Sequence, residues 1–91
     1  MSERILIVDD EERIRKLLNM YLAREGYEIT EADNGEDALE LALEQNFHCI
    51  LLDLMMPKMD GIEVAKRLRT QKSTPIIMLT AKGEENNRVE G

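Results

Sequence analysis

The sequence contains one cysteine and no long apolar run. The single Cys49 allows no disulfide within the chain, so a reducing cytoplasm is the natural compartment. Because Cys49 lies inside a short apolar run, we expect a buried core thiol. No stretch approaches the roughly 20 apolar residues of a membrane span. The start, MSERILIV, is not typical of a signal peptide, because its apolar run is short and ends in acids.

Basic residues are also scarce relative to acids. Twelve Lys and Arg residues oppose nineteen Asp and Glu residues, which gives a net charge of −7. This balance argues against nucleic-acid contact and against binding to anionic membranes, since both need a basic face. With 91 residues, 43% of them hydrophobic, the chain is typical of one globular domain. We find no linker, low-complexity segment or internal repeat.

Short apolar runs predict the strands of a sheet. Three of them are continuous, at residues 5–8, 49–52 and 76–79, which favours strands buried on both faces of a parallel sheet. A weaker run at 27–31 alternates in polarity and follows Gly26, as expected of a strand near a sheet edge.

Between these runs the apolar residues recur at helical spacing. The first helix has an apolar stripe formed by Ile14, Leu17, Leu18, Tyr21 and Leu22. Its basic residues Arg13, Arg15, Lys16 and Arg24 are predicted to face mostly solvent. Further helices are predicted within 33–46 and 61–71, and 83–91 could begin another. Alternating strands and helices predict βαβ units with parallel strands and right-handed crossovers.

Polar residues follow the strands at their carboxyl ends. Asp9 and Asp10 follow the first run, Asp53 the third and Thr80 the fourth. Since parallel strands place these ends at one sheet edge, the four residues should converge. Clustered carboxylates raise at least one pKa, and a hard cation such as Mg²⁺ or Mn²⁺ would relieve their repulsion. A carboxylate there could act as a nucleophile that forms an aspartyl phosphate, with Thr80 donating to a phosphoryl oxygen.

Each of these residues also has a simpler explanation. Asp9 and Asp10 could cap the first helix, and Asp53 or Thr80 could be ordinary strand-end residues. The coincidence of all of them at strand carboxyl ends favours a functional site.

Three motifs in order, ILIVDDE, LLDLMMPKMDG and PIIMLTAKG, resemble the receiver domain of bacterial two-component response regulators. The resemblance covers the whole chain. It implies the α/β, flavodoxin-like (CheY-like) three-layer fold with a parallel sheet, here in the order 2-1-3-4. It is closest to receivers of the OmpR and ResD type, which precede a winged-helix DNA-binding domain.

The resemblance also implies a role for each site residue. Asp53 would accept a phosphoryl group from a sensor histidine kinase. Asp10 would bind Mg²⁺ directly, Asp9 through water, and Met55 through its main-chain carbonyl. Thr80 would contact the phosphoryl group and reorient, and the small Ala81 would leave access to the site. Such a protein is a phosphoacceptor that catalyses only its own phosphorylation and dephosphorylation, and not an enzyme acting on other substrates.

One departure from the family pattern is the absence of a fifth strand, of the Lys that ends it and of the helix that follows. We therefore expect residues 1–91 to form a receiver domain truncated at its C-terminus. The strand at 76–79 would be an exposed edge, which predicts a homodimer, domain swapping or poor stability of the monomer.

Three alternative functions share features with this sequence. A flavin-binding module would need a Ser-, Thr- or Gly-rich loop where DDEERIR stands. A phosphatase of the haloacid dehalogenase type would need an Asp at position 55, which is Met. An inert receiver fragment that acts only in interaction or dimerisation stays open, because the fifth-strand Lys is missing.

Overall fold

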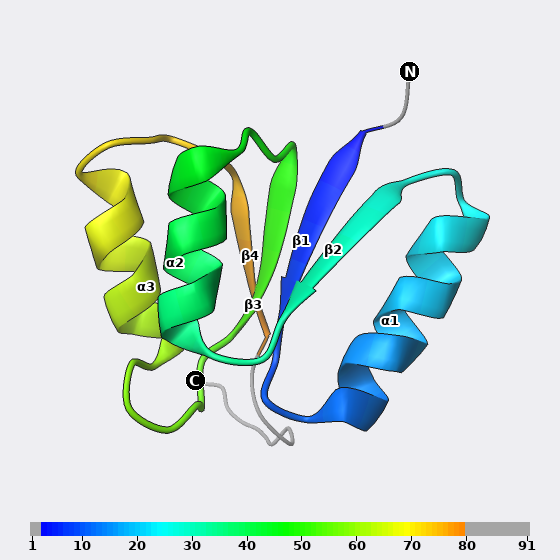
Figure 1. Ribbon diagram of the computed structural model, residues 1–91, viewed down its shortest axis with the longest axis horizontal. Coiled ribbons are helices and arrows are strands. Elements are labelled where there is room, and N and C mark those ends of the chain that lie inside the picture. Colours follow the sequence, from blue (N-terminus) through cyan, green and yellow to red (C-terminus); the bar gives the residue numbers. More distant parts are fainter. Residues whose placement is uncertain (1–2, 80–91) are drawn as a thin grey trace, which may run out of the picture.

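The protein is described by a computed structural model that covers residues 3–79. Four parallel strands form one sheet in the order β2-β1-β3-β4, which is the order that the family resemblance implied. The elements run in the order β1 (Arg4–Val8), α1 (Glu12–Arg24), β2 (Glu28–Ala32), α2 (Gly35–Glu44), β3 (Cys49–Asp53), α3 (Gly61–Arg69) and β4 (Ile76–Leu79). Figure 1 shows three layers, with α1 on one side of the sheet and α2 and α3 on the other.

The main core lies between the sheet and the α2–α3 layer. Small residues of α2, Ala38 and Ala42, are 1% and 2% exposed, which lets this helix approach the sheet closely. Val64 and Leu68 of α3 are also buried. They belong to one apolar cluster with strand residues such as Leu52. This layer is well packed because each helix has a continuous apolar stripe.

The opposite layer is packed less completely. Helix α1 has no buried residue, although it carries the predicted apolar stripe. Leu17 and Tyr21 are 46% and 57% exposed, whereas Leu18 and Leu22 are half-buried against the sheet. Only the inner edge of the stripe therefore contributes to burial. The helix gives way to β2 through Gly26, whose φ of +97° suits glycine.

Strand β4 differs from its sequence prediction. Continuous apolarity predicted burial on both faces, but Ile77 and Met78 are exposed. The apolar run predicts that a strand forms, but the burial of that strand depends on which elements cover it. Within residues 3–79, β4 is an edge of the sheet, which agrees with the predicted 2-1-3-4 order. Cys49, predicted to be buried, is only half-buried.

None of the helices within residues 3–79 is long and apolar enough to cross a membrane. The predicted helix start at 83–91 lies outside the described residues.

Candidate functional site

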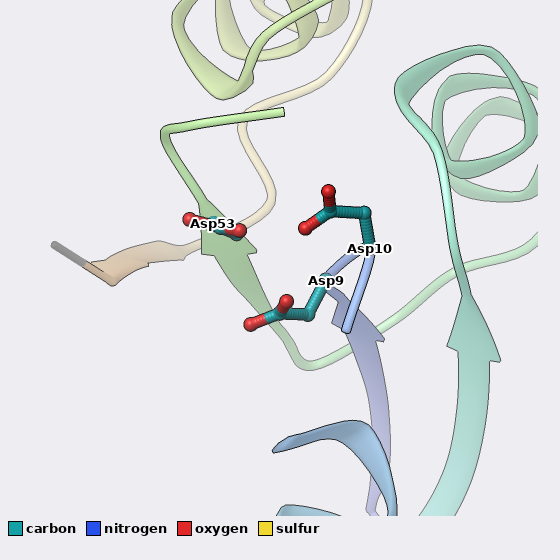
Figure 2. Close-up of side chains that lie close together, drawn as sticks. All are labelled: Asp9, Asp10 and Asp53. Atoms are coloured by element: carbon teal, nitrogen blue, oxygen red, sulfur yellow. The ribbon is translucent and has the colours of Figure 1, made fainter. Parts of the chain in front are cut away.

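The candidate site lies at the carboxyl ends of β1 and β3. In the parallel pairing of these strands Val8 is opposite Leu52, so the residues that follow, Asp9 and Asp53, are neighbours. Asp9, Asp10 and Asp53 each offer a carboxylate oxygen, and these atoms all lie within 4.8 Å of one another. Figure 2 shows Asp10 and Asp53 extending toward the same space from the two strand ends, with Asp9 beside them. We call these three residues the acid cluster.

The three carboxylates differ in burial and in hydrogen bonding. Asp9 and Asp53 are only 6% and 5% exposed, whereas Asp10 is exposed. The Glu11 N–H donates to Asp9 Oδ1 at 2.9 Å, and the Met55 N–H donates to Asp53 Oδ1 at 3.1 Å. No hydrogen bond from the described part of the chain reaches the Asp10 carboxylate. Asp10 is therefore positioned mainly by its backbone.

Burial raises the pKa of the Asp9 carboxyl above its ordinary value. The hydrogen bond from the Glu11 N–H opposes this shift, while the charges of Asp53 and Asp10 add to it. The expectation that clustered carboxylates would raise at least one pKa is thus met at Asp9. A buried, ionised Asp9 is costly without a positive charge nearby, so the cluster suits a cation.

The start of α3 packs directly against Asp53. A Cβ added at Gly61 would lie 2.4 Å from the Asp53 carbonyl oxygen and 2.9 Å from the Leu54 Cα, so only glycine fits. The Asp60 side chain caps the helix by accepting from the Glu63 N–H at 3.0 Å. This close approach explains why a glycine stands at the start of α3.

One residue beside the cluster was not predicted from the sequence. Arg15 was predicted to face solvent, but its side chain is only 13% exposed. Its guanidinium donates to the Asp9 carbonyl oxygen at 2.9 Å and to Glu31 at 3.1 Å. One feature of the sequence could have predicted this contact. Arg15 and Asn19 lie one helical turn apart, and the neighbouring strand carries an acid that both can reach.

Of the predicted site residues, the structure brings Asp9, Asp10 and Asp53 together. Met55 lies next to them in the loop, with its side chain 65% exposed and its N–H on the Asp53 carboxylate. Thr80 and Ala81 lie outside the described residues. The donor set is oxygen alone, with two buried carboxylates and one open to solvent, and it fits a hard divalent cation.

Comparison with known proteins points to one family. Residues 5–91 match the response regulator receiver domain. The transcriptional regulatory protein SrrA of Staphylococcus aureus is 71% identical over all 91 residues, and the chain spans 38% of the length of that relative.

Solved structures agree. The response regulator TrrA of Thermotoga maritima, in complex with Mg²⁺-BeF, has a TM-score of 0.82 and 49% identity over 87% of this chain and 70% of that one. A complex of the histidine kinase ThkA with TrrA has a TM-score of 0.82 and 44% identity, over 96% of this chain and 76% of that one. These likenesses are found both in the fold and in the overall sequence identity. The chain therefore belongs to the response regulator receiver domain family.

Proposed function

We propose that this receiver domain accepts a phosphoryl group on Asp53. The observation that carries the proposal is the acid cluster, in which Asp53 lies almost fully buried at a strand end within 4.8 Å of two further carboxylates. A purely structural acid would not be placed in such a repulsive position, since the charges disfavour one another.

The geometry at Asp53 favours one reacting oxygen. Because the Met55 N–H donates to Oδ1, Oδ2 is the more available nucleophile. In the step we propose, Oδ2 attacks the phosphorus of a phosphohistidine, a P–O bond forms and the P–N bond breaks. The leaving imidazole nitrogen keeps the electron pair and takes up a proton.

Asp10 and Asp53 would bind Mg²⁺ directly, and Mn²⁺ could replace it. Asp9 would act through water and Met55 through its carbonyl. When bound, the cation neutralises charge on the transferring group and on the carboxylates. The chain's own contribution is to fix Asp53 at the strand end and to shield it from bulk water.

The proposed partner is a sensor histidine kinase, since TrrA is seen in complex with the kinase ThkA. A role in controlling transcription is proposed because SrrA is a transcriptional regulatory protein. Four statements stay predictions: the cytoplasmic location, the lack of nucleic-acid contact by this segment, and the roles of Thr80 and Ala81.

The test is incubation of the 91-residue chain with acetyl phosphate and Mg²⁺, followed at once by intact-mass measurement. We expect an adduct of one phosphoryl group that disappears with Asp53→Asn, a substitution that keeps an oxygen acceptor for the Met55 N–H. Asp33→Asn is the matched control, because Asp33 is exposed and follows β2. No adduct on the parent chain, or an equal adduct on Asp53→Asn, would favour the inert fragment.

We also propose that the chain associates through β4, either as a homodimer or by domain swapping. Ile77 and Met78 are 54% and 44% exposed on an edge strand of the described sheet, and such edges pair readily with other strands. Light scattering should detect a concentration-dependent dimer that Ile77→Lys abolishes. Met20→Lys, which removes an equally exposed apolar side chain from α1, should leave it intact. A monodisperse parent monomer across the micromolar range would contradict the proposal.

A further inference from the structure

The main chain on both sides of Asp9 is fixed by contacts from two other elements. The Asp9 N–H donates to the Ala32 carbonyl at the end of β2, at 3.2 Å. The Asp9 carbonyl accepts from Arg15 Nη1 of α1, at 2.9 Å. Because this carbonyl belongs to the same planar unit as the Asp10 N–H, Arg15 sets the orientation in which the chain enters Asp10.

Arg15 is itself held by a second pair of contacts. Its Nε donates to Glu31 Oε1 at 3.1 Å, and the other oxygen, Oε2, accepts from Asn19 Nδ2 at 2.6 Å. The Arg15 and Glu31 side chains are only 13% and 18% exposed. A guanidinium offers several donors in a rigid, planar arrangement, so one face of Arg15 is fixed by Glu31 while another reaches the Asp9 carbonyl. We call Arg15, Asn19 and Glu31 the Arg15 network.

We propose that Arg15 is a positioning residue for the cation site, acting through the main chain of Asp9 to fix Asp10. The inference rests on the proposed function, because it assumes that the acid cluster binds a divalent cation. Asp10 is the member of the cluster that needs such support. Its carboxylate receives no hydrogen bond from the described residues, whereas those of Asp9 and Asp53 each accept one from a main-chain N–H.

A role through charge and a role through positioning predict opposite changes in cation affinity when Arg15 is removed. A positive side chain close to a cation site repels the cation, so loss of Arg15 should tighten binding if only its charge matters. If Arg15 acts by positioning Asp10, its loss should weaken Mg²⁺ binding. Loss of a contact that orients a metal ligand typically lowers metal affinity by about 10- to 100-fold. The sign of the change therefore separates the two roles.

The experiment is calorimetric titration of Mg²⁺ into the 91-residue chain, without any phosphoryl donor. We expect Arg15→Met to weaken binding by about tenfold. Arg13→Met is the matched control, because Arg13 is an exposed arginine of the same helix. It removes the same charge without touching Asp9, and binding should be unchanged or slightly tighter. Circular dichroism at the titration temperature checks that each variant is folded.

Arg15→Lys provides a second variant in case Arg15→Met fails to fold. It keeps the charge, but one ammonium group does not reproduce the separate contacts of Nη1 and Nε, so weaker Mg²⁺ binding is again expected. In NMR spectra of the metal-free chain, both Arg15 variants should shift the Asp10 amide resonance, which Arg13→Met should not move.

The outcomes distinguish this inference from the proposed function. If the parent chain binds no Mg²⁺, the metal site fails and the inference fails with it. If the parent chain binds Mg²⁺ and the folded Arg15 variants bind it equally or more tightly, the inference alone is overturned. A parent chain that binds Mg²⁺ but gives no phosphoryl adduct would leave the positioning role supported by the titrations and the phosphoacceptor role contradicted.

Discussion

The two faces of the sheet are covered in different ways. On one face, α2 and α3 bury small and branched apolar residues, and Leu68 is 0% exposed. On the other, no residue of α1 itself is buried, and the contacts of this helix with neighbouring elements include polar ones. The Arg15 side chain pairs with Glu31 of β2 and with the main chain beyond β1.

This difference indicates a division of roles. A close-packed apolar layer supplies stability in proportion to the area it removes from water, and it tolerates few changes. A layer joined by a few directional hydrogen bonds contributes less to stability but fixes particular atoms in place. Here the atoms that the α1 layer fixes belong to the acid cluster. The face that is less well packed therefore also helps to position the acid cluster.

The largest expected effect tests the packed face. Leu68→Ala should lower the free energy of unfolding by about 2–5 kcal/mol, because it leaves a cavity in a close-packed layer. Leu17→Ala on α1 should cost about 0.5 kcal/mol or less, since that side chain is 46% exposed. Urea denaturation of both variants measures the difference. Similar losses of unfolding free energy would mean that the two faces contribute equally to stability.

The next effect concerns the close approach at Gly61. Gly61→Ala would place a methyl group against the main chain of Asp53, and we expect a loss of about 1–3 kcal/mol from overpacking. Mg²⁺ affinity, measured by calorimetry, should fall as well, because the methyl group displaces the Asp53 peptide.

Gly26→Ala is the control on the α1 side. No atom lies within 4 Å of the added Cβ, but φ is +97°, so it should cost about 1 kcal/mol through backbone strain alone. It should leave Mg²⁺ affinity unchanged. Equal losses of affinity in the two variants would show that general destabilisation is the cause.

Most of the fold and the centre of the site follow from the sequence. Short apolar runs separated by helical stripes specify a parallel sheet, and the carboxyl ends of its strands share one edge. This geometry was sufficient to predict that Asp53 would meet Asp9 and Asp10, although more than 40 positions separate them along the printed sequence.

The role of Arg15 did not follow from the pattern. Helical spacing assigns a side chain to a face of its own helix, and Arg15 lies at the border of the apolar stripe. A long guanidinium at that border can turn either to solvent or to an acid on a neighbouring strand. The choice depends on Glu31, 16 residues away, and on the strand register. Likewise, the exposure of Ile77 depends on what covers β4 and not on its apolarity.

A smaller effect, dependent on pH, tests the polar face. The hydrogen bond from Asn19 lowers the pKa of Glu31, and Arg15 and Lys16 act in the same direction against burial. A lowered folded-state pKa adds stability above the ordinary pKa of Glu, and that stability is lost as the pH falls through the folded value. Glu31→Gln should therefore cost about 1–2 kcal/mol near pH 7, and the difference from the parent chain should shrink in acid.

Urea denaturation at several pH values measures this change. The matched control is Glu28→Gln, on the same strand but with a side chain that is 68% exposed. It should change stability by about 0.5 kcal/mol or less at pH 7. A Glu31→Gln loss that stays constant down to acid pH would contradict an electrostatic origin.

The smallest effect compares two ion pairs, one on each side of the sheet. Glu63 and Arg67 of α3 form an i,i+4 pair at 2.7 Å, with side chains 42% and 56% exposed. Water and salt screen such a pair, so its coupling energy should be about 0.3–0.5 kcal/mol in a double-mutant cycle. The cycle of Arg15 and Glu31 should give a larger and less salt-sensitive coupling, because both side chains are mostly buried. Equal coupling energies would mean that the α1 side is joined no more firmly than an exposed helix surface, and the contrast between the two faces would then rest on apolar packing alone.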